Sequence, residues 1–142
     1  MSKFLVVANQ TALSPELTNS LLEKSKNDPQ ARFILVVPAT PLEHLLSREA
    51  GDAAQIAARR AGQALIHLTN MGIPMTGAHV GGGSLTMAID EAIGPHQKDF
   101  AGIILCTFPP GSSRWLDREL SSSLEKAFHL PVTHVVARPS NH

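Results

Sequence analysis

The chain has 142 residues, of which 43% are hydrophobic and 4% aromatic, so a single domain with an aliphatic core is expected. The 12 Lys and Arg residues balance the 12 Asp and Glu residues and form no basic stripe, which argues against a nucleic-acid partner. Cys106 is the only cysteine, which excludes an intrachain disulfide, and no apolar run suits a signal peptide or a membrane span. We therefore expect a cytoplasmic protein that makes no membrane contact.

The first quarter of the chain alternates strand and helix signals. Phe4–Ala8 is a short apolar run that predicts a strand. Ser14 and Pro15 predict a helix start, because the serine hydroxyl caps free N–H groups and proline fits the first helical position. This helix is expected to end near Asn27, and Arg32–Val37, which is rich in β-branched residues, predicts the second strand.

A longer connector, Pro38–Asp52, separates the second strand from the second helix and contains one candidate helical turn at Leu42–Leu46. The second helix is expected from about Ala53 to Asn70, with an alanine-rich face that would let it lie close to a sheet. The residues expected on this inner face are Ala53, Ile56, Ala57, Ala61, Ala64, Leu65 and Leu68. The residues expected on its outer face are Arg59, Gln63 and His67.

The remainder of the chain continues the alternation. The expected elements are strand Met75–Val80, a helix from Ser84 to about Ile93, strand Gly102–Cys106, helix Arg114–Phe128 and strand Val132–Ala137. Strict alternation predicts parallel strands, because such strands need crossover helices. The predicted fold class is therefore α/β, a single doubly wound domain over residues 1–142, with a five-stranded parallel sheet and helices on both faces.

The segment that follows the fourth strand is the strongest candidate for a binding site. Open α/β sheets place their ligands at the carboxyl ends of the strands, and a helix that opens on serines offers free N–H groups to an anion. The candidate anion- or nucleotide-binding residues in this segment are Thr107, Ser112, Ser113, Arg114 and Arg118. A rigid turn with ordinary helix capping explains the same serines equally well. Trp115 is expected to pack against a neighbouring helix rather than to shield a ligand.

This order of elements resembles the universal stress protein family over the whole chain, and the likeness is sharpest over Phe100–Ala137. Gly83–Ile93 likewise resembles the family's glycine-rich turn and amphipathic helix. The resemblance implies the strand order 3-2-1-4-5, a homodimer, and in many members ATP bound between the carboxyl ends of strands one and four. It also implies that Asn9, Val37 and Gly111 are candidate ligand contacts.

The glycine motif of the ATP-binding members is broken in this sequence. Those members carry two glycines separated by two residues, nine further residues, and then Gly-Ser or Gly-Thr. Aligned back from Pro131, the final pair falls on Arg118 and Glu119; aligned forward, the first two glycines fall on Cys106 and Pro109, or on Leu105 and Phe108. Glycines there permit close backbone approach to phosphate, whereas Glu119 would repel it. The acidic residue at the end of strand one is Asn9 here, whose amide still hydrogen-bonds but carries no charge.

Other chemistries find little support in the sequence. The run Gly81–Ser84 is read as a flexible turn, with a phosphate cradle as its alternative. The seven histidines match no zinc spacing, so no metal site is expected. No Gly-x-Ser-x-Gly elbow is present, and Cys106 lies in an apolar strand that hides a thiol, so no catalytic residue is predicted.

The last strand predicts the mode of self-association. In the strand order implied by the resemblance, Val132–Ala137 forms an edge of the sheet that carries neither lysine nor an internal proline. We therefore expect a homodimer joined through this strand, while a protein partner of another kind stays unknown. The alternative is a monomer whose edge is protected by Pro131, Arg138 and Pro139.

The leading functional hypothesis is a cytoplasmic universal-stress-type protein that has a binding or regulatory role and is not an enzyme. No cofactor is firmly expected, and any ATP or other adenine nucleotide is expected to bind weakly. The first alternative is a functional ATP-binding protein with slow or no hydrolysis, in which serines and arginines replace the lost glycines. The second is an enzyme of unknown reaction on the same scaffold, since a fold does not fix a function.

Overall fold

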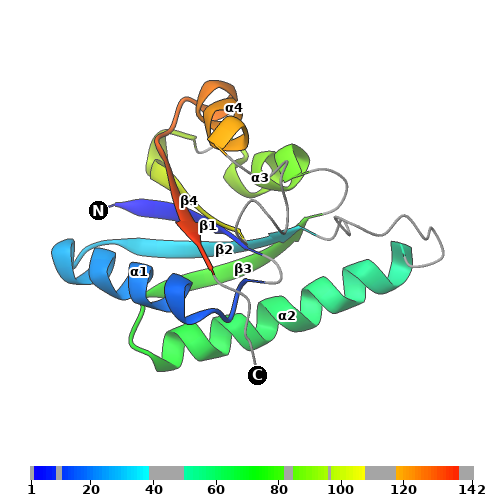
Figure 1. Cartoon of the computed structure of the whole chain (residues 1–142), viewed down its shortest axis with the longest axis horizontal. Coiled ribbons are helices and arrows are strands. Elements are labelled where there is room, and N and C mark those ends of the chain that lie inside the picture. Colours follow the sequence, from blue (N-terminus) through cyan, green and yellow to red (C-terminus); the bar gives the residue numbers. More distant parts are fainter. Residues whose placement is uncertain are drawn as a thin grey trace.

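The structure is a computed structural model that describes residues 2–8, 11–38, 50–81, 85–95, 97–107 and 118–137, the side chains of residues 50–54, 97 and 118–120 excepted. Strands and helices alternate along the chain, as the sequence predicts (Figure 1). They are β1 (Lys3–Val7), α1 (Pro15–Asn27), β2 (Arg32–Pro38), α2 (Ala50–Asn70), β3 (Met75–Gly81), α3 (Leu85–Ile93), a 3-10 turn (Gln97–Asp99), β4 (Phe100–Thr107), α4 (Arg118–Phe128) and β5 (Val132–Val136).

The five strands form one parallel sheet in the order β3-β2-β1-β4-β5. The predicted fold class and strand order are therefore confirmed. Leu5 of β1 lies between Ile34 of β2 and Ile103 of β4, at the centre of the sheet. The chain moves outward from β1 to β3 and then returns to the other side of β1 with β4, so the direction of winding reverses between β1 and β4.

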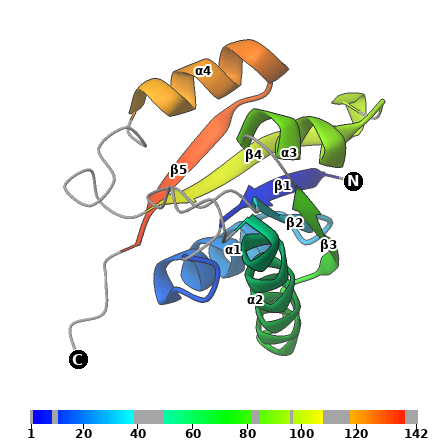
Figure 2. The same ribbon diagram turned by 90° about the vertical axis from the view of Figure 1, so that its right-hand side faces the viewer.

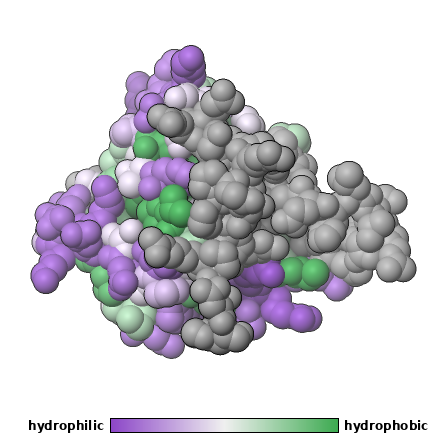
Figure 3. Space-filling model, viewed as in Figure 1, coloured by the Kyte–Doolittle hydropathy of each residue, from purple (hydrophilic) through white to green (hydrophobic). Residues whose placement is uncertain are grey.

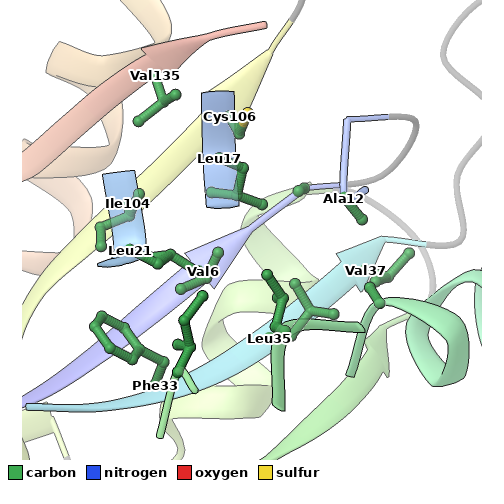
Figure 4. Packing of buried hydrophobic residues seen from close by; sticks show 14 of the residues in the cluster. Val6, Ala12, Leu17, Leu21, Phe33, Leu35, Val37, Ile104, Cys106 and Val135 are labelled. Carbon is green, nitrogen blue, oxygen red and sulfur yellow. The ribbon is translucent and has the colours of Figure 1, made fainter. Parts of the chain in front are cut away.

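Two helices cover each face of the sheet: α1 and α2 lie on one side, and α3 and α4 on the other (Figures 1 and 2). Each face has its own apolar cluster, because successive residues of a strand point to opposite faces. Figure 4 shows the cluster on the α1 and α2 side, where Leu17 and Leu21 of α1 pack over Val6, Ile104 and Cys106. The opposite cluster is centred on Leu5, Val7, Ile89, Ile103, Leu105 and Leu124.

The buried face of α2 is narrower than predicted. Ala57, Ala61, Ala64 and Leu68 are buried at spacings of four, three and four, which is the stripe that a helix presents to a flat sheet. Ile56 was expected beside them, but it is 49% exposed, since each helical residue is turned by about 100° from the one before it. That prediction is wrong. Leu65 is partly buried, and the side chain of Ala53 lies outside the described residues.

His67 also departs from its predicted place on the outer face of α2. It is partly buried, and its Nε2 lies 3.3 Å from Thr18 Oγ1 of α1. Thr18 Oγ1 also donates to the Ser14 carbonyl at 3.2 Å, which leaves its lone pairs to accept a hydrogen bond from the imidazole. The contact ties α1 to α2.

Several predicted features lie outside the described residues: the Leu42–Leu46 turn, the Ser84 cap, Trp115, and residues 114–117 of the expected fourth helix. Within the described part of the chain, no helix combines the length and the apolar character needed to cross a membrane. The same part of the chain contains no group of His, Cys, Asp or Glu side chains able to hold a metal ion.

Candidate functional site

The carboxyl ends of β1 and β4 lie side by side, where the winding of the sheet reverses. In open α/β sheets, loops leave such a point in opposite directions and form the binding crevice. Here the chain that follows β1 crosses the end of β4, because Thr11 Oγ1 donates a buried hydrogen bond to the Cys106 carbonyl at 2.8 Å. Ala8 N–H donates to the Val36 carbonyl of β2 at 3.1 Å, which extends the ladder to the same edge.

On the α1 side of the sheet, the carboxyl ends of β1 and β4 carry a small cluster of hydroxyl groups and one thiol. Ser14 Oγ accepts the Leu17 N–H at 3.2 Å as the helix cap, and it lies 3.9 Å from Cys106 Sγ. Burial raises the pKa of the Cys106 thiol, and nearby Glu16 raises it further, while contacts with Thr11 and Ser14 act in the opposite direction. The thiol is therefore protonated at neutral pH. It is also hidden, because Cys106 is only 4% exposed. A hidden neutral thiol is a poor nucleophile.

On the α4 side of the sheet, the carboxyl end of β4 carries a hydroxyl group paired with an imidazole. Thr107 Oγ1 at the end of β4 lies 2.6 Å from His134 Nε2 of β5. Thr107 is 5% exposed, and its carbonyl accepts the Ala137 N–H at 2.8 Å, so its backbone and its side chain are both held by the end of β5. Two polar side chains are thus fixed where parallel strands present ligands, on the face that α4 covers.

Among the predicted site residues, Val37 and Thr107 are fully described. Val37 is the last residue but one of β2, is completely buried, and belongs to the cluster of Figure 4. Arg118 is the first residue of α4, and its side chain lies outside the described residues. Asn9, Gly111, Ser112, Ser113 and Arg114 lie wholly outside them. The contacts of these residues with a ligand stay predictions.

Two polar residues at this end of the sheet, Thr11 and His134, are not among the site residues predicted from the sequence. Thr11 follows β1 in a polar connector, and only the strand order brings it to Cys106, which is 95 residues away in the chain. His134 occupies an alternate position in an apolar strand, which was a visible signal of a polar contact. Its partner depends on the register that sets His134 opposite Leu105, two residues before Thr107.

Comparison with known proteins gives matches of structure only. No protein-family model matches the sequence, and no curated protein matches it at a significant level. Among solved structures, 13 chains match. A protein of the universal stress protein family from Burkholderia pseudomallei superposes with a TM-score of 0.61 at 14% identity, covering 96% of both chains. A universal stress protein from Archaeoglobus fulgidus gives a TM-score of 0.62 at 12% identity, covering 95% of this chain and 93% of that one.

The chain has the universal stress protein fold. The match extends along nearly the whole length of both relatives, so it covers the sheet, both helical layers and the reversal point together. The predicted resemblance is thereby confirmed at the level of the fold. At 14% and 12% identity the side chains at the edge of the sheet are this chain's own, and its Thr107–His134 pair has to be interpreted from its own geometry.

Proposed function

We propose that the protein is a universal-stress-type binding or regulatory protein of the cytoplasm, with a role in the stress response and without enzymatic activity. The observation that carries this proposal is the match of fold over 96% of the chain to a member of the universal stress protein family. The chemistry at the carboxyl ends of the strands argues against catalysis, because the described polar groups there are held in hydrogen bonds and the thiol is protonated and buried.

We further propose that ATP binds weakly or not at all. In the forward alignment the first glycine of the ATP motif falls on Cys106 or Leu105, and both side chains are packed into opposite faces of the core. A backbone that carries these side chains cannot approach a phosphate as closely as glycine does. In the alignment from Pro131 the final Gly-Ser is replaced by the first two residues of α4, Arg118 and Glu119.

A thermal-shift measurement with millimolar Mg-ATP tests this proposal. A ligand at about a hundred times its dissociation constant stabilises the folded state by roughly 2.7 kcal/mol, whereas we expect no measurable shift. A shift of that size that is abolished by Arg114→Ala would establish the alternative, a working adenine-nucleotide binder. Because Arg114 is one of the predicted binding residues, a shift that survives its replacement would indicate ATP bound elsewhere.

The protein is also proposed to form a homodimer through β5. In the described part of the chain, β5 pairs with β4 on one side only, and β5 contains no Lys, Arg, Asp or Glu. Val136 is 40% exposed, and Figure 3 shows apolar surface over β5 (red in Figure 1) on the face turned to the viewer. Pairing with a second copy about a two-fold axis would cover both the strand edge and this apolar surface.

A further inference from the structure

The backbone groups of β5 divide into two sets. The Pro131 carbonyl accepts the Ile103 N–H at 2.9 Å, and the Ala137 N–H donates to the Thr107 carbonyl at 2.8 Å, so residues 131 and 137 face β4. Because successive residues of a strand point their N–H and C=O groups to opposite sides, Thr133 and Val135 face β4 as well. The N–H and C=O groups of Val132, His134 and Val136 point away from β4, toward the edge of the sheet.

One of these outward-pointing donors is already engaged within the chain. Glu125 Oε2 of α4 accepts the Val132 N–H at 3.1 Å. The backbone of the same residue holds the turn between α4 and β5, because the Glu125 carbonyl accepts the His129 N–H at 2.8 Å and His129 has a φ of 56°. Such a left-handed residue is a common end of a helix. Glu125 therefore fixes the amino end of β5 by its backbone and closes the edge there by its carboxylate.

We propose that Glu125 sets the register of self-association, a step that rests on the proposed homodimer. Two copies of β5 in antiparallel pairing could place the two-fold axis at the middle residue, His134, and then Val132 would lie opposite Val136 of the second copy. That register needs the Val132 N–H, and the symmetry would break the Glu125 hydrogen bond in both copies. The axis therefore lies nearer the carboxyl end of the strand, at Val135 or Val136. Val132 then faces a position beyond Val136, the last residue of β5 in the second copy, so both Glu125 contacts are kept.

Single cysteines test the register directly. Residues that face each other across an antiparallel pair have Cα atoms about 4.5–5.5 Å apart, which suits a disulfide, and only a residue on the axis faces its own copy. We expect mild oxidation to cross-link either Val135→Cys or Val136→Cys and not His134→Cys, with peptide mass spectrometry to set aside Cys106. A His134→Cys cross-link in a dimer, or no cross-link from Val135→Cys and Val136→Cys, would overturn the assignment.

Variants of Glu125 test whether its side chain controls the register of pairing. Glu125→Ala frees the Val132 N–H, so His134→Cys should become able to cross-link in that background. The matched control is Glu125→Gln, whose amide oxygen still accepts the Val132 N–H and should keep the original pattern. Identical cross-linking in the alanine and glutamine variants would show that Glu125 does not set the register.

Sedimentation of the unmodified protein distinguishes failure of this inference from failure of the proposed homodimer. A monomer at micromolar concentration would refute the homodimer, and the role of Glu125 would then be decided by its two variants. If Glu125→Ala associates and Glu125→Gln does not, the result would support the role of the Glu125 side chain in blocking the strand edge at Val132. The role of Glu125 would be refuted if both variants were monomers and the Val132 amide hydrogen exchanged equally fast in the unmodified protein and in Glu125→Ala.

Discussion

The Cys106 thiol lies at the carboxyl end of β4 with 4% of its surface exposed and with Ser14 Oγ 3.9 Å from its sulfur. Burial is the largest cause of its raised pKa, so the protonated form is the one the folded protein favours. We expect iodoacetamide to label Cys106 far more slowly in the native protein than in the urea-unfolded chain at pH 7.5. Equal labelling rates in the two states would contradict the buried position.

The same raised pKa predicts a dependence of stability on pH. The folded state holds the thiol proton to higher pH than the unfolded chain, whose thiol titrates near pH 8.5. This contribution is complete below that pH and is lost as the pH rises toward the pKa of the folded state. Urea unfolding should therefore show that Cys106→Ala, compared with the unmodified protein, loses less stability between pH 8 and pH 10. Parallel alkaline declines of the two proteins would refute the assignment.

At the scale of single residues, the sequence predicted environments better than partners. An apolar run was enough to place Cys106 inside a covered strand, and Ser14 before Pro15 was enough to predict the cap that the Leu17 N–H confirms. The partners of Thr11 and His134 depend instead on which strands are neighbours and in what register, and neither quantity is local in the sequence.

At the scale of elements, β3 and α3 meet at Gly81. A Cβ at this position would lie 2.3 Å from the Ala88 Cβ and 2.6 Å from its Cα, so the strand and the helix would have to move apart. We expect Gly81→Ala to lower the free energy of unfolding by about 1–3 kcal/mol, the usual cost of overpacking. Urea unfolding followed by circular dichroism measures this change.

The matched control for Gly81→Ala is Gly62→Ala in α2. An added Cβ there meets nothing within 4 Å, so the substitution only replaces glycine in the interior of a helix. It should raise the free energy of unfolding by roughly 0.5–1 kcal/mol. The same change of side chain is thus expected to have opposite signs at the two positions, and a stabilising Gly81→Ala would show that β3 and α3 do not approach so closely.

The strands were predictable because a parallel strand covered on both faces reads as a continuous apolar run, as Ile103, Ile104 and Leu105 do. Helix boundaries followed from caps, and α1 spans Pro15–Asn27 as its cap and its expected end require. The faces of α2 were harder to predict, because an alanine-rich helix has a weak amphipathic pattern. Ile56, a strongly hydrophobic residue near the start of α2, points outward.

At the scale of the whole molecule, the sequence predicted the order of elements and their single sheet, and the match to universal stress proteins covers both. The site was less accessible. The sequence identifies the residues that align with the broken motif. The contacts at the carboxyl ends of β1 and β4 form only when these two strands become neighbours in the fold. The hydrogen bond between Thr11 and the Cys106 carbonyl is such a contact.

The proposed dimer is a property of the whole molecule, and Val136 is the residue at which it is best tested. Val135 belongs to the apolar cluster and its backbone faces β4, so replacing it by proline or lysine would damage the domain itself. Val136 is 40% exposed, and its N–H points toward the edge. Val136→Pro should therefore remove a donor to the second copy while leaving the ladder with β4 intact.

We expect Val136→Pro and Val136→Lys to raise the dissociation constant of the dimer at least tenfold in sedimentation equilibrium, with a change in unfolding free energy of the monomer below about 1 kcal/mol. Ile66→Lys is the control, because Ile66 is 64% exposed on α2, the helix that packs on β2 and β3, and the substitution adds the same charge. Equal weakening by Ile66→Lys would indicate a general effect of charge. An unchanged dissociation constant in both Val136 variants would place the contact between copies on a surface other than β5.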